Sequence, residues 1–388
     1  PDGLSKEFYV ENWNTIKNIL HEIYNNAIAF KSICKTWNGC NVTLIPKKGT
    51  TKSIRNWRPI SLLNFDYKIL TKVIANRIKN ILPSLVSRSQ KCSVPGRTIT
   101  DALRNIASIY EYCSMKNLPF IIINFDQRKA FDTVNHDFLF KILEKQNFGR
   151  RTIGLIKELY QNAYSRIDTN GALTDNIPIL RGLRQGCPLS MLLYTLVADP
   201  LARYINSRND VIGIRIGNIT TKIQQYADDM TATVRDTKSV KTIFEVFQLF
   251  REATGQRLNE EKTEMLTKHH RTKLEIHGTS FKGYLQNQIT VLGQKIGYNQ
   301  ESDTWKEVQK KVEKRLNIYR GRKLTWYGKT LLLHSVASGR ILYHARVMTM
   351  NLKVIKELER VIFNFLWLPE KIEVIGRKKL IAEKKNSG

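Results

Sequence analysis

The sequence predicts an α+β fold with two or three lobes. The chain has 388 residues, of which 42% are hydrophobic, so it can bury a large core but exceeds the usual size of a single one. Segments with helical periodicity alternate with short apolar runs that are typical of strands. One such run, residues 119–126 (PFIIINFD), is apolar almost throughout, which indicates a strand buried on both faces.

The predicted helices follow from apolar residues that recur every three or four positions. The first covers residues 5–31, and its apolar face is expected to comprise Phe8, Trp13, Ile16, Ile19, Leu20 and Ile23. The second covers residues 61–82 and is expected to end at Pro83, because proline lacks the N–H that a helix requires. Further helices are predicted at residues 98–116, 136–147, 152–164, 190–207 and 239–254.

Strands are predicted between these helices. Residues 41–50 are expected to form a short strand that runs into a basic turn, and the buried strand at 119–126 ends in a carboxylate, Asp126. Two strands are expected to flank the YADD sequence at residues 226–229, and a last strand is predicted at residues 289–296.

The charge of the chain indicates a polyanionic partner. Lys and Arg number 63 against 34 Asp and Glu, a formal net charge of +29, and nucleic acid is the first candidate. Residues 301–388 contain 20 of these basic residues and 9 acidic ones. We therefore expect a helical lobe that binds a nucleic-acid backbone; the alternative is a solvated helical surface.

A membrane partner is the competing interpretation of this charge. A membrane-spanning helix is excluded, because no run of about 20 apolar residues occurs. A membrane-surface protein is also disfavoured, because the charge is spread over several lobes and no single basic amphipathic helix dominates.

The cysteines and the N-terminus bear on the compartment. The five cysteines are odd in number and lack zinc-ligand spacing, so we expect reduced thiols in a cytosolic or nuclear protein. The first residues, PDGLSKEFYVENW, resemble neither a signal peptide nor a transit peptide. Because they also lack an initiator Met, we expect the chain to be a fragment.

Two adjacent aspartates, Asp228 and Asp229, interrupt the strand-like sequence QQYADDMTAT. Adjacent antiparallel strands would bring Asp228 close to Asp126. Two carboxylates repel unless cations bind between them, and hard oxygen ligands select Mg²⁺ or Mn²⁺, two of which can promote phosphoryl transfer. Successive strand residues face opposite sides, so Asp228 is the expected partner and Asp229 a neighbour. The alternatives are an ordinary Asp-rich turn and unrelated strand-end acids.

At this point the sequence resembles a family. NFDQRKAFDTV, RGLRQGCPLS and YADD occur in that order and together resemble the central motifs of reverse transcriptases. LIPKKG, NWRPISLLNFDYKILTKVIANRI and SVPGRTITDAL resemble the fingers of the non-LTR (LINE-type) retrotransposon enzymes. PDGLSKEFY resembles their amino-terminal extension, and TGQRLNEEKTE and VLGQKI the motifs after the catalytic hairpin. The resemblance therefore covers nearly the whole chain.

The resemblance implies a right-hand polymerase fold. Its parts would be an N-terminal helical extension at residues 1–40, fingers at 41–118, a palm at 119–300 with a fingers insertion near 139–180, and a basic helical thumb at 301–388. The implied metal ligands for two Mg²⁺ (or Mn²⁺) ions are Asp126, the backbone carbonyl of Gln127, Asp228 and Asp229.

The resemblance also implies roles for other residues. Phe131 would exclude the 2′-hydroxyl of a ribonucleotide, and Gln185 and Gly186 would pack under the incoming nucleotide and template. Lys47 and Arg58 would contact the triphosphate. The alternatives are a core Phe, a turn Gly and a solvated Lys.

Lys262 would protonate the leaving pyrophosphate. Its alternative is a helix-end lysine paired with Glu260 or Glu264.

The implied function is an RNA-directed DNA polymerase that extends a DNA primer on an RNA template with dNTPs, in target-primed reverse transcription. The nicking endonuclease would belong to a missing domain of the full-length protein. We expect a nuclear and cytoplasmic ribonucleoprotein, with no targeting segment. The alternatives are a group II intron-type reverse transcriptase and a non-catalytic nucleic-acid binder. The sequence departs from the family at Cys92 and Ser93, which replace Gly-Phe, and at Met191, which replaces Pro; these changes concern template contact, not the metal site.

Overall fold

The computed structural model describes residues 2–30, 32–47, 52–267, 275–276, 279–280 and 285–367. The chain divides into two compact units. The first comprises Pro1–Ala102 and Asn117–Leu285, and the second Leu103–Lys116 and Gln286–Gly388. None of the described helices combines the length and the hydrophobicity that crossing a bilayer requires.

The first unit is built around a sheet whose central strand is the predicted apolar one. The strand order is β10-β11-β3-β13-β16, with β3 at Ile121–Phe125, β10 at Ile223–Tyr226, β11 at Asp229–Val234, β13 at Glu264–Thr267 and β16 at Leu285–Gln286. Both neighbours of β3 are antiparallel to it, and Ile121, Ile122 and Ile123 are completely buried. The prediction of a strand buried on both faces is therefore confirmed.

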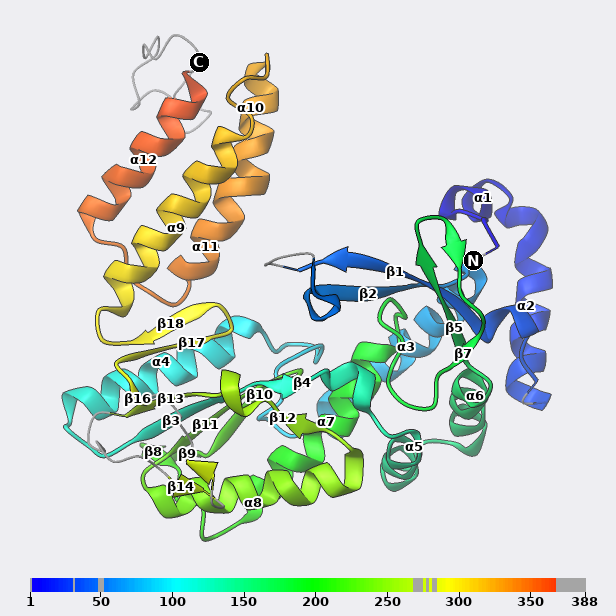
Figure 1. Ribbon diagram of the computed structural model, residues 1–388, viewed down its shortest axis with the longest axis horizontal. Helices are drawn as coiled ribbons and strands as arrows, with labels where there is room; N and C mark the ends of the chain where they lie inside the picture. Colours follow the sequence, from blue (N-terminus) through cyan, green and yellow to red (C-terminus); the bar gives the residue numbers. More distant parts are fainter. Residues whose placement is uncertain are drawn as a thin grey trace. The chain divides into compact units, whose positions relative to one another are not determined.

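Two long helices cover this sheet. They are α7 (Ser190–Ser207) and α8 (Thr237–Thr254), and Figure 1 shows both along one side of the sheet. The ring of Phe125 lies 4.7 Å from that of Phe247 and 5.5 Å from that of Phe244, both on α8. Aromatic packing at these distances fixes the end of β3 that leads into Asp126.

A second sheet has the order β2-β1-β5-β6, with β7 also paired to β5. The strands are β1 (Gly39–Pro46), β2 (Trp57–Leu62), β5 (Tyr164–Thr169), β6 (Ala172–Leu173) and β7 (Ile177–Pro178). The strands β5 to β7 were not predicted, because their side chains are half-buried or exposed and show little alternation. The signal that could have revealed them is Asn170-Gly171, whose positive φ angles of 53° and 86° form a tight hairpin turn.

The first predicted helix is broken. It forms α1 (Lys6–Glu11) and α2 (Trp13–Phe30), separated at Asn12, whose side-chain N–H donates to the Phe8 carbonyl at 2.9 Å. Asparagine competes in this way with the helical hydrogen bonds. The predicted apolar face is also wrong in part, because Phe8, Trp13 and Ile19 are exposed.

Other boundaries also differ from prediction. The helix predicted from residue 61 begins at Phe65, because Ser61 and Leu62 belong to β2. Helix α3 (Phe65–Leu85) continues through Pro83 for part of a turn, where Ser84 Oγ donates to the Ile81 carbonyl at 2.7 Å. Residues 289–296 form a hairpin rather than one strand: β17 (Gln288–Val291) and β18 (Gln294–Gly297) meet at Leu292-Gly293, where both φ angles are positive. The helices α4 (Ile99–Met115) and α5 (His136–Lys145) form close to their predicted bounds, whereas α6 (Arg150–Gln161) ends before residue 164 because Tyr164 begins β5. Short ribbons pair β8 (Ile214–Ile216) with β9 (Ile219–Thr221) and β14 (Glu275–Ile276) with β15 (Thr279–Ser280).

The second unit is mainly helical. It contains α9 (Gln300–Asn317), α10 (Trp326–Leu332), a π-helical segment (Leu333–Ser338), α11 (Gly339–Ala345) and α12 (Leu352–Leu366). Its own core includes Trp305, Val312, Leu358 and Phe365. The helices predicted from residue 301 onward are thus present as far as Leu366, and residues 368–388 lie outside the described part.

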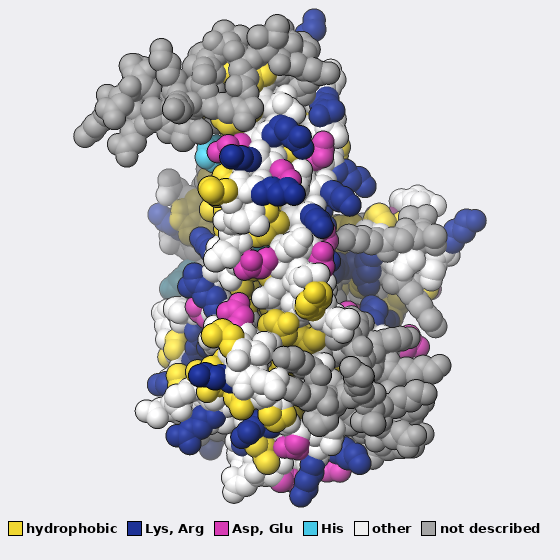
Figure 2. Space-filling model, turned by 90° about the vertical axis from the view of Figure 1, so that its left-hand side faces the viewer, with side chains coloured by type: hydrophobic (Ala, Val, Ile, Leu, Met, Phe, Trp, Pro, Cys, Tyr) yellow, Lys and Arg dark blue, Asp and Glu magenta, His cyan; other side chains and the backbone are white. Residues whose placement is uncertain are grey.

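The positive charge is not gathered in a single patch on the face shown in Figure 2. Lys and Arg side chains are spread over that face, with Asp and Glu side chains between them.

Candidate active site

The two central aspartates stand at neighbouring strand ends. Asp126 directly follows β3, and Asp228 lies in the turn between β10 and β11. Strand β11 is antiparallel to β3 with Met230 opposite Phe125, so the antiparallel register brings the two acids together as expected. Asp126 is close enough for its charge to raise the pKa of Asp228.

The turn that carries Asp228 is strained and braced. Ala227 has φ of 56°, a left-handed conformation that is uncommon for a residue other than glycine. Its N–H donates to the side-chain oxygen of Gln90 at 3.2 Å, and that oxygen also accepts from the Cys92 N–H at 3.0 Å. Gln90 is completely buried, so its amide holds the turn in place. Sequence reasoning missed Gln90, because nothing local marks this glutamine as different from others.

Burial and neighbouring carboxylates raise the pKa of two acids, Asp228 and Asp229. Burial raises the pKa of Asp228, and the Asp126 charge adds to this, while Arg58 opposes it. Desolvation of the carboxylate by the surrounding protein raises the pKa of Asp229 to about 6, and the charges of Asp228 and Asp126 add to this. Asp229 is exposed overall and does not line the pocket into which Asp126 and Asp228 project.

The donor set fits a divalent cation shared by two carboxylates. Asp126 and Asp228 supply hard oxygen ligands whose mutual repulsion a cation would relieve. Within the described residues, no three His, Cys, Asp or Glu side chains are gathered as a ready-made metal cluster. Mg²⁺ commonly takes one or two carboxylates and completes its shell with water and phosphate oxygens, so a two-carboxylate site is compatible with it.

Residues next to the acids are held by a two-stranded ribbon. Strand β4 (Gln127–Arg128) pairs antiparallel with β12 (Arg257–Leu258). Asn259, directly after β12, donates from its side chain to Asp126 Oδ2 at 2.8 Å and from its N–H to the Asp126 carbonyl at 2.7 Å. The Gln127 side chain accepts from the Tyr194 hydroxyl at 2.7 Å and contacts the Met230 sulfur, so it is occupied within the protein.

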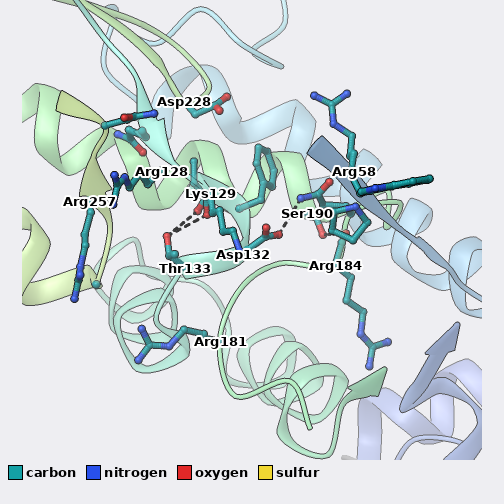
Figure 3. Close-up of a pocket in the computed structure, with 18 of the residues that line it drawn as sticks. Arg58, Arg128, Lys129, Asp132, Thr133, Arg181, Arg184, Ser190, Asp228 and Arg257 are labelled. Carbon is teal, nitrogen blue, oxygen red and sulfur yellow. Dashed lines mark hydrogen bonds between the residues drawn. The ribbon is translucent and has the colours of Figure 1, made fainter. Parts of the chain in front are cut away.

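One large pocket contains nearly all of the predicted site. It encloses about 1890 Å³, and its lining includes Lys47, Arg58, Asp126, Gln127, Phe131, Gln185, Gly186, Asp228 and Lys262. Of the predicted site residues, Asp229 alone is outside this lining. Nine Lys or Arg residues and five Asp or Glu residues line the pocket, so it favours an anionic substrate (Figure 3).

The pocket floor is shaped by packing. The ring of Phe131 stacks on that of Tyr194, with centroids 4.5 Å apart and planes at 22°. The Gln185 side chain donates to Asp132 Oδ1 at 2.8 Å. Gly186 has φ of +120°, and a Cβ there would lie 2.6 Å from the Ser61 carbonyl oxygen. Glycine is the residue that tolerates both this positive φ and this close approach to the Ser61 backbone.

The basic side chains predicted to bind substrate come from different elements of the fold. Lys47 follows β1 and Arg58 lies on β2, and both are exposed. Lys262 ends a short 3₁₀ helix (Glu260–Lys262) and is exposed. In the described part of the chain Lys262 forms no ion pair, so the alternative pairing is not observed.

Several arginines of the pocket were not predicted. Arg184 is buried, donates to the carbonyls of Trp37 and Asn38 at 2.8 and 2.7 Å, and lies over the Tyr67 ring, so its role is structural. Arg128, Arg181, Arg251 and Arg257 are exposed in the pocket lining. A surface arginine carries no sequence signal of its own, so only the fold reveals that these converge.

Two of the departures from the family are neighbours. The Cys92 thiol donates to the Met191 sulfur at 3.7 Å. Ser93 has φ of 58°. The replacements at Cys92 and Met191 therefore pack against each other beside the turn that carries Asp228.

The chain is similar to known reverse transcriptases and retrotransposon proteins. Residues 45–296 match the family described as "Reverse transcriptase (RNA-dependent DNA polymerase)". The "Transposon TX1 uncharacterized 149 kDa protein" of Xenopus laevis is 28% identical over 373 residues, which is 95% of this chain and 28% of that protein. The "Retrovirus-related Pol polyprotein from type-1 retrotransposable element R2" of Popillia japonica is 27% identical over 230 residues, 58% of this chain and 32% of that protein. The chain thus spans less than a third of the length of these relatives.

A solved structure is similar in fold. The telomerase of Candida Tropicalis, in complex with the TWJ fragment of telomeric RNA, aligns with a TM-score of 0.50 at 13% identity over 95% of this chain and 66% of that one. At this identity the likeness concerns the fold alone, and it confirms the predicted α+β right-hand polymerase architecture.

Proposed function

Because the chain belongs to the reverse transcriptase (RNA-dependent DNA polymerase) family, we propose that it is the polymerase core of a non-LTR retrotransposon, which copies the element's RNA into DNA. The observation that supports this most strongly is the pairing of Asp126 and Asp228 in a large basic pocket. A mere nucleic-acid binder gains nothing from two repelling carboxylates in such a pocket, so that alternative is not favoured. The relatives named as R2 and TX1 proteins favour the non-LTR lineage over a group II intron-type enzyme.

Reverse transcriptases generally use divalent metal ions. Here Asp126, Asp228, the Gln127 carbonyl and Asp229 would hold two Mg²⁺ or Mn²⁺ ions. When bound, such ions make the primer 3′-hydroxyl more acidic and neutralise charge on the triphosphate.

The other pocket residues position the substrates. Phe131, held flat against Tyr194, would lie under the sugar and exclude a 2′-hydroxyl. Gln185 and Gly186 would support the base pair. Arg58 and Lys47 would bind the triphosphate, as guanidinium and ammonium groups commonly do.

Lys262 is exposed at the pocket rim and forms no ion pair within the described residues. Its ammonium would donate a proton to the departing pyrophosphate.

The partners follow from the same proposal. They are an RNA template, a DNA primer and dNTPs, with the fingers, palm and thumb boundaries as predicted above. In the full-length protein an endonuclease domain would nick the target and supply the primer, and the assembly would act as a nuclear and cytoplasmic ribonucleoprotein.

Primer extension on an RNA template with dNTPs and Mg²⁺ tests this function. We expect Asp228→Asn to lower the rate on the order of 10³-fold, because it removes several kcal/mol of charge stabilisation. Asp175→Asn, at an exposed loop position outside the pocket, is the matched control and should keep the parent's rate. An Asp228→Asn variant as active as the parent would exclude this site. Binding of template–primer without extension by the parent would instead support a binding protein.

A further inference from the structure

The helical second unit contains a basic pocket of its own. Residues 318–325 form a loop that joins α9 to α10, at the end of α9 that lies away from β18 (Figure 1). The pocket beside this loop encloses about 540 Å³, a volume that suits a ligand as large as a nucleotide. None of the residues described in its lining belongs to the lining of the active-site pocket.

The charge of this pocket has one sign. The part of its lining that the structure describes contains no Asp or Glu and four basic residues: Arg320, Arg322, Lys323 and Lys329. Lys329 is held in place, because its ammonium group donates to the Leu366 carbonyl at 2.7 Å and lies 5.5 Å from the centre of the Trp326 ring. The active-site pocket, by contrast, has acids that can share a cation. The 318–325 loop therefore favours an anion.

The other three basic side chains are available to such an anion. Arg320, Arg322 and Lys323 are exposed, and within the described residues they form no ion pair. The Arg322 guanidinium lies over the Tyr319 ring, 5.5 Å from its centre, which orients the group and leaves its N–H donors available. Guanidinium groups bind phosphate oxygens through paired N–H donors, and a bound phosphate would also relieve the repulsion between the three charges.

Exposed aromatic side chains follow the loop directly. Trp326 is 50% exposed and Tyr327 is 79% exposed. The Trp326 ring is fixed by Trp367, with ring centres 4.8 Å apart and planes at 78°. Basic groups beside exposed rings are what proteins use to bind single strands, because phosphates contact the charges and unpaired bases stack on the rings. Bases inside a duplex already stack on both faces, so a duplex cannot use such rings in this way.

We propose that the 318–325 loop, together with Trp326 and Tyr327, binds a single-stranded segment of nucleic acid outside the polymerase pocket. Arg320 and Arg322 would bind its phosphate oxygens, and the two rings would stack on its unpaired bases. The inference goes beyond the proposed function, because it requires neither metal ions nor dNTPs. It assigns the loop to unpaired bases and not to the template–primer duplex.

Fluorescence anisotropy with a labelled single-stranded RNA of about 12 nucleotides tests this site. An excess of blunt template–primer duplex occupies the polymerase pocket and should leave the RNA bound at the loop. In the double variant Arg320→Gln/Arg322→Gln the Kd for the RNA should rise about tenfold or more, because charge-assisted hydrogen bonds to phosphate are lost. Displacement of the RNA by the blunt duplex would overturn the proposal.

The matched control for charge is Lys306→Gln/Lys310→Gln. These exposed lysines lie on α9, outside both pockets, and their replacement changes the net charge equally. The Kd should stay within about twofold of the parent's, since salt screens charge effects at a distance. Equal losses in the two double variants would show diffuse attraction and overturn the proposal. Thermal melting checks folding, and Lys323→Gln gives a second measurement if the arginine variant does not fold.

Stacking is tested separately from charge. Tyr327→Ala should raise the Kd for the RNA about fivefold or more, because a base loses its aromatic partner. Tyr298→Ala is the matched control, since Tyr298 is 69% exposed in the same unit and lies outside both pockets. Its Kd should be that of the parent. An unchanged Kd for Tyr327→Ala would contradict the stacking and with it the proposed single-strand site.

A single-stranded DNA of the same sequence identifies the source of the strand. Tighter binding of the RNA would assign the loop to template RNA and tighter binding of the DNA to a DNA strand, and either result supports the site. A parent that binds single strands through this loop but extends no primer would contradict the proposed function and leave this site standing. A parent that extends a primer but binds no single strand beside the duplex would do the reverse.

Discussion

At the scale of single residues, Gly186 shows how closely the pocket is built. The backbone carbonyl of its neighbour Gln185 accepts a hydrogen bond from the Ser61 N–H at 2.9 Å, so this loop lies directly against β2. A side chain at Gly186 would meet the Ser61 carbonyl, which is backbone and cannot rotate away.

We therefore expect Gly186→Ala to lower the free energy of unfolding by about 2 kcal/mol or more, through left-handed strain and the clash combined. Urea unfolding measures this loss. Gly171→Ala is the matched control, because Gly171 has φ of +86° but open space around it. It should lose only about 1 kcal/mol, from backbone strain alone. Equal losses would show that the approach to Ser61 is unimportant.

The sequence predicts those site residues that belong to a recognisable motif. Asp126, Asp228, Phe131, Gln185 and Gly186 were all predicted, and the fold places them on one pocket.

Arg257, Asn259 and Gln90 were missed, because each acts through a partner far away in the chain. Asn259 becomes meaningful only when β12 is paired with β4, and no local pattern encodes that pairing.

At the scale of elements, the long apolar segments were predicted well and the short ones poorly. The helix at 190–207 forms with the predicted bounds, because its apolar residues are buried nearly all round. The sequence predicts one strand at residues 289–296, whereas the structure has a hairpin at 288–297, because Leu292 adopts a positive φ that leucine rarely shows. Helix α2 keeps exposed apolar residues, so periodicity alone does not tell which face is buried.

Helix α11 provides a pH-dependent element in the second unit. His344 contacts the Gln294 side-chain oxygen and lies near Glu307, Lys311 and Arg340. Burial, followed by the Lys311 charge, lowers the pKa of His344 to about 4, with Arg340 adding to this and Glu307 opposing it. Because this pKa is below that of an unfolded histidine, the unfolded state binds more protons than the native state between pH 6.5 and 4. The free energy of unfolding is therefore at its full value above pH 6.5 and decreases as the pH falls toward 4.

We expect the free energy of unfolding to fall by about 1–2 kcal/mol over this range on account of His344, after allowance for solvent screening. His344→Gln should flatten the dependence, as followed by urea unfolding at a series of pH values. His21→Gln, at an exposed position on α2, should leave it unchanged. A parent whose stability does not vary between pH 6.5 and 4 would refute this prediction.

At the scale of the whole molecule, the net charge of +29 favours binding to a polyanion. Lys and Arg side chains are spread over the face in Figure 2 and also dominate the pocket. Such a distribution favours contacts with many phosphates over recognition of a few bases.

The affinity for template–primer should therefore fall about 10³-fold or more between 50 and 200 mM salt, because neutralising several phosphates releases bound counterions. A log–log plot of Kd against salt concentration gives the slope. A duplex with an uncharged peptide backbone is the control and should bind far more weakly, with little salt dependence. A flat slope for the natural duplex would show that the charge does not drive binding.

The central position of β3 has a consequence for how the chain is made. Its residue Ile123 pairs with Ala232 and Met265, which are synthesised 109 and 142 residues later. Until both partners leave the ribosome, the most apolar strand of the chain has two open edges, and such long-range pairing makes folding slow. A translation product that stops between β3 and β13 would retain an open edge and be prone to aggregate.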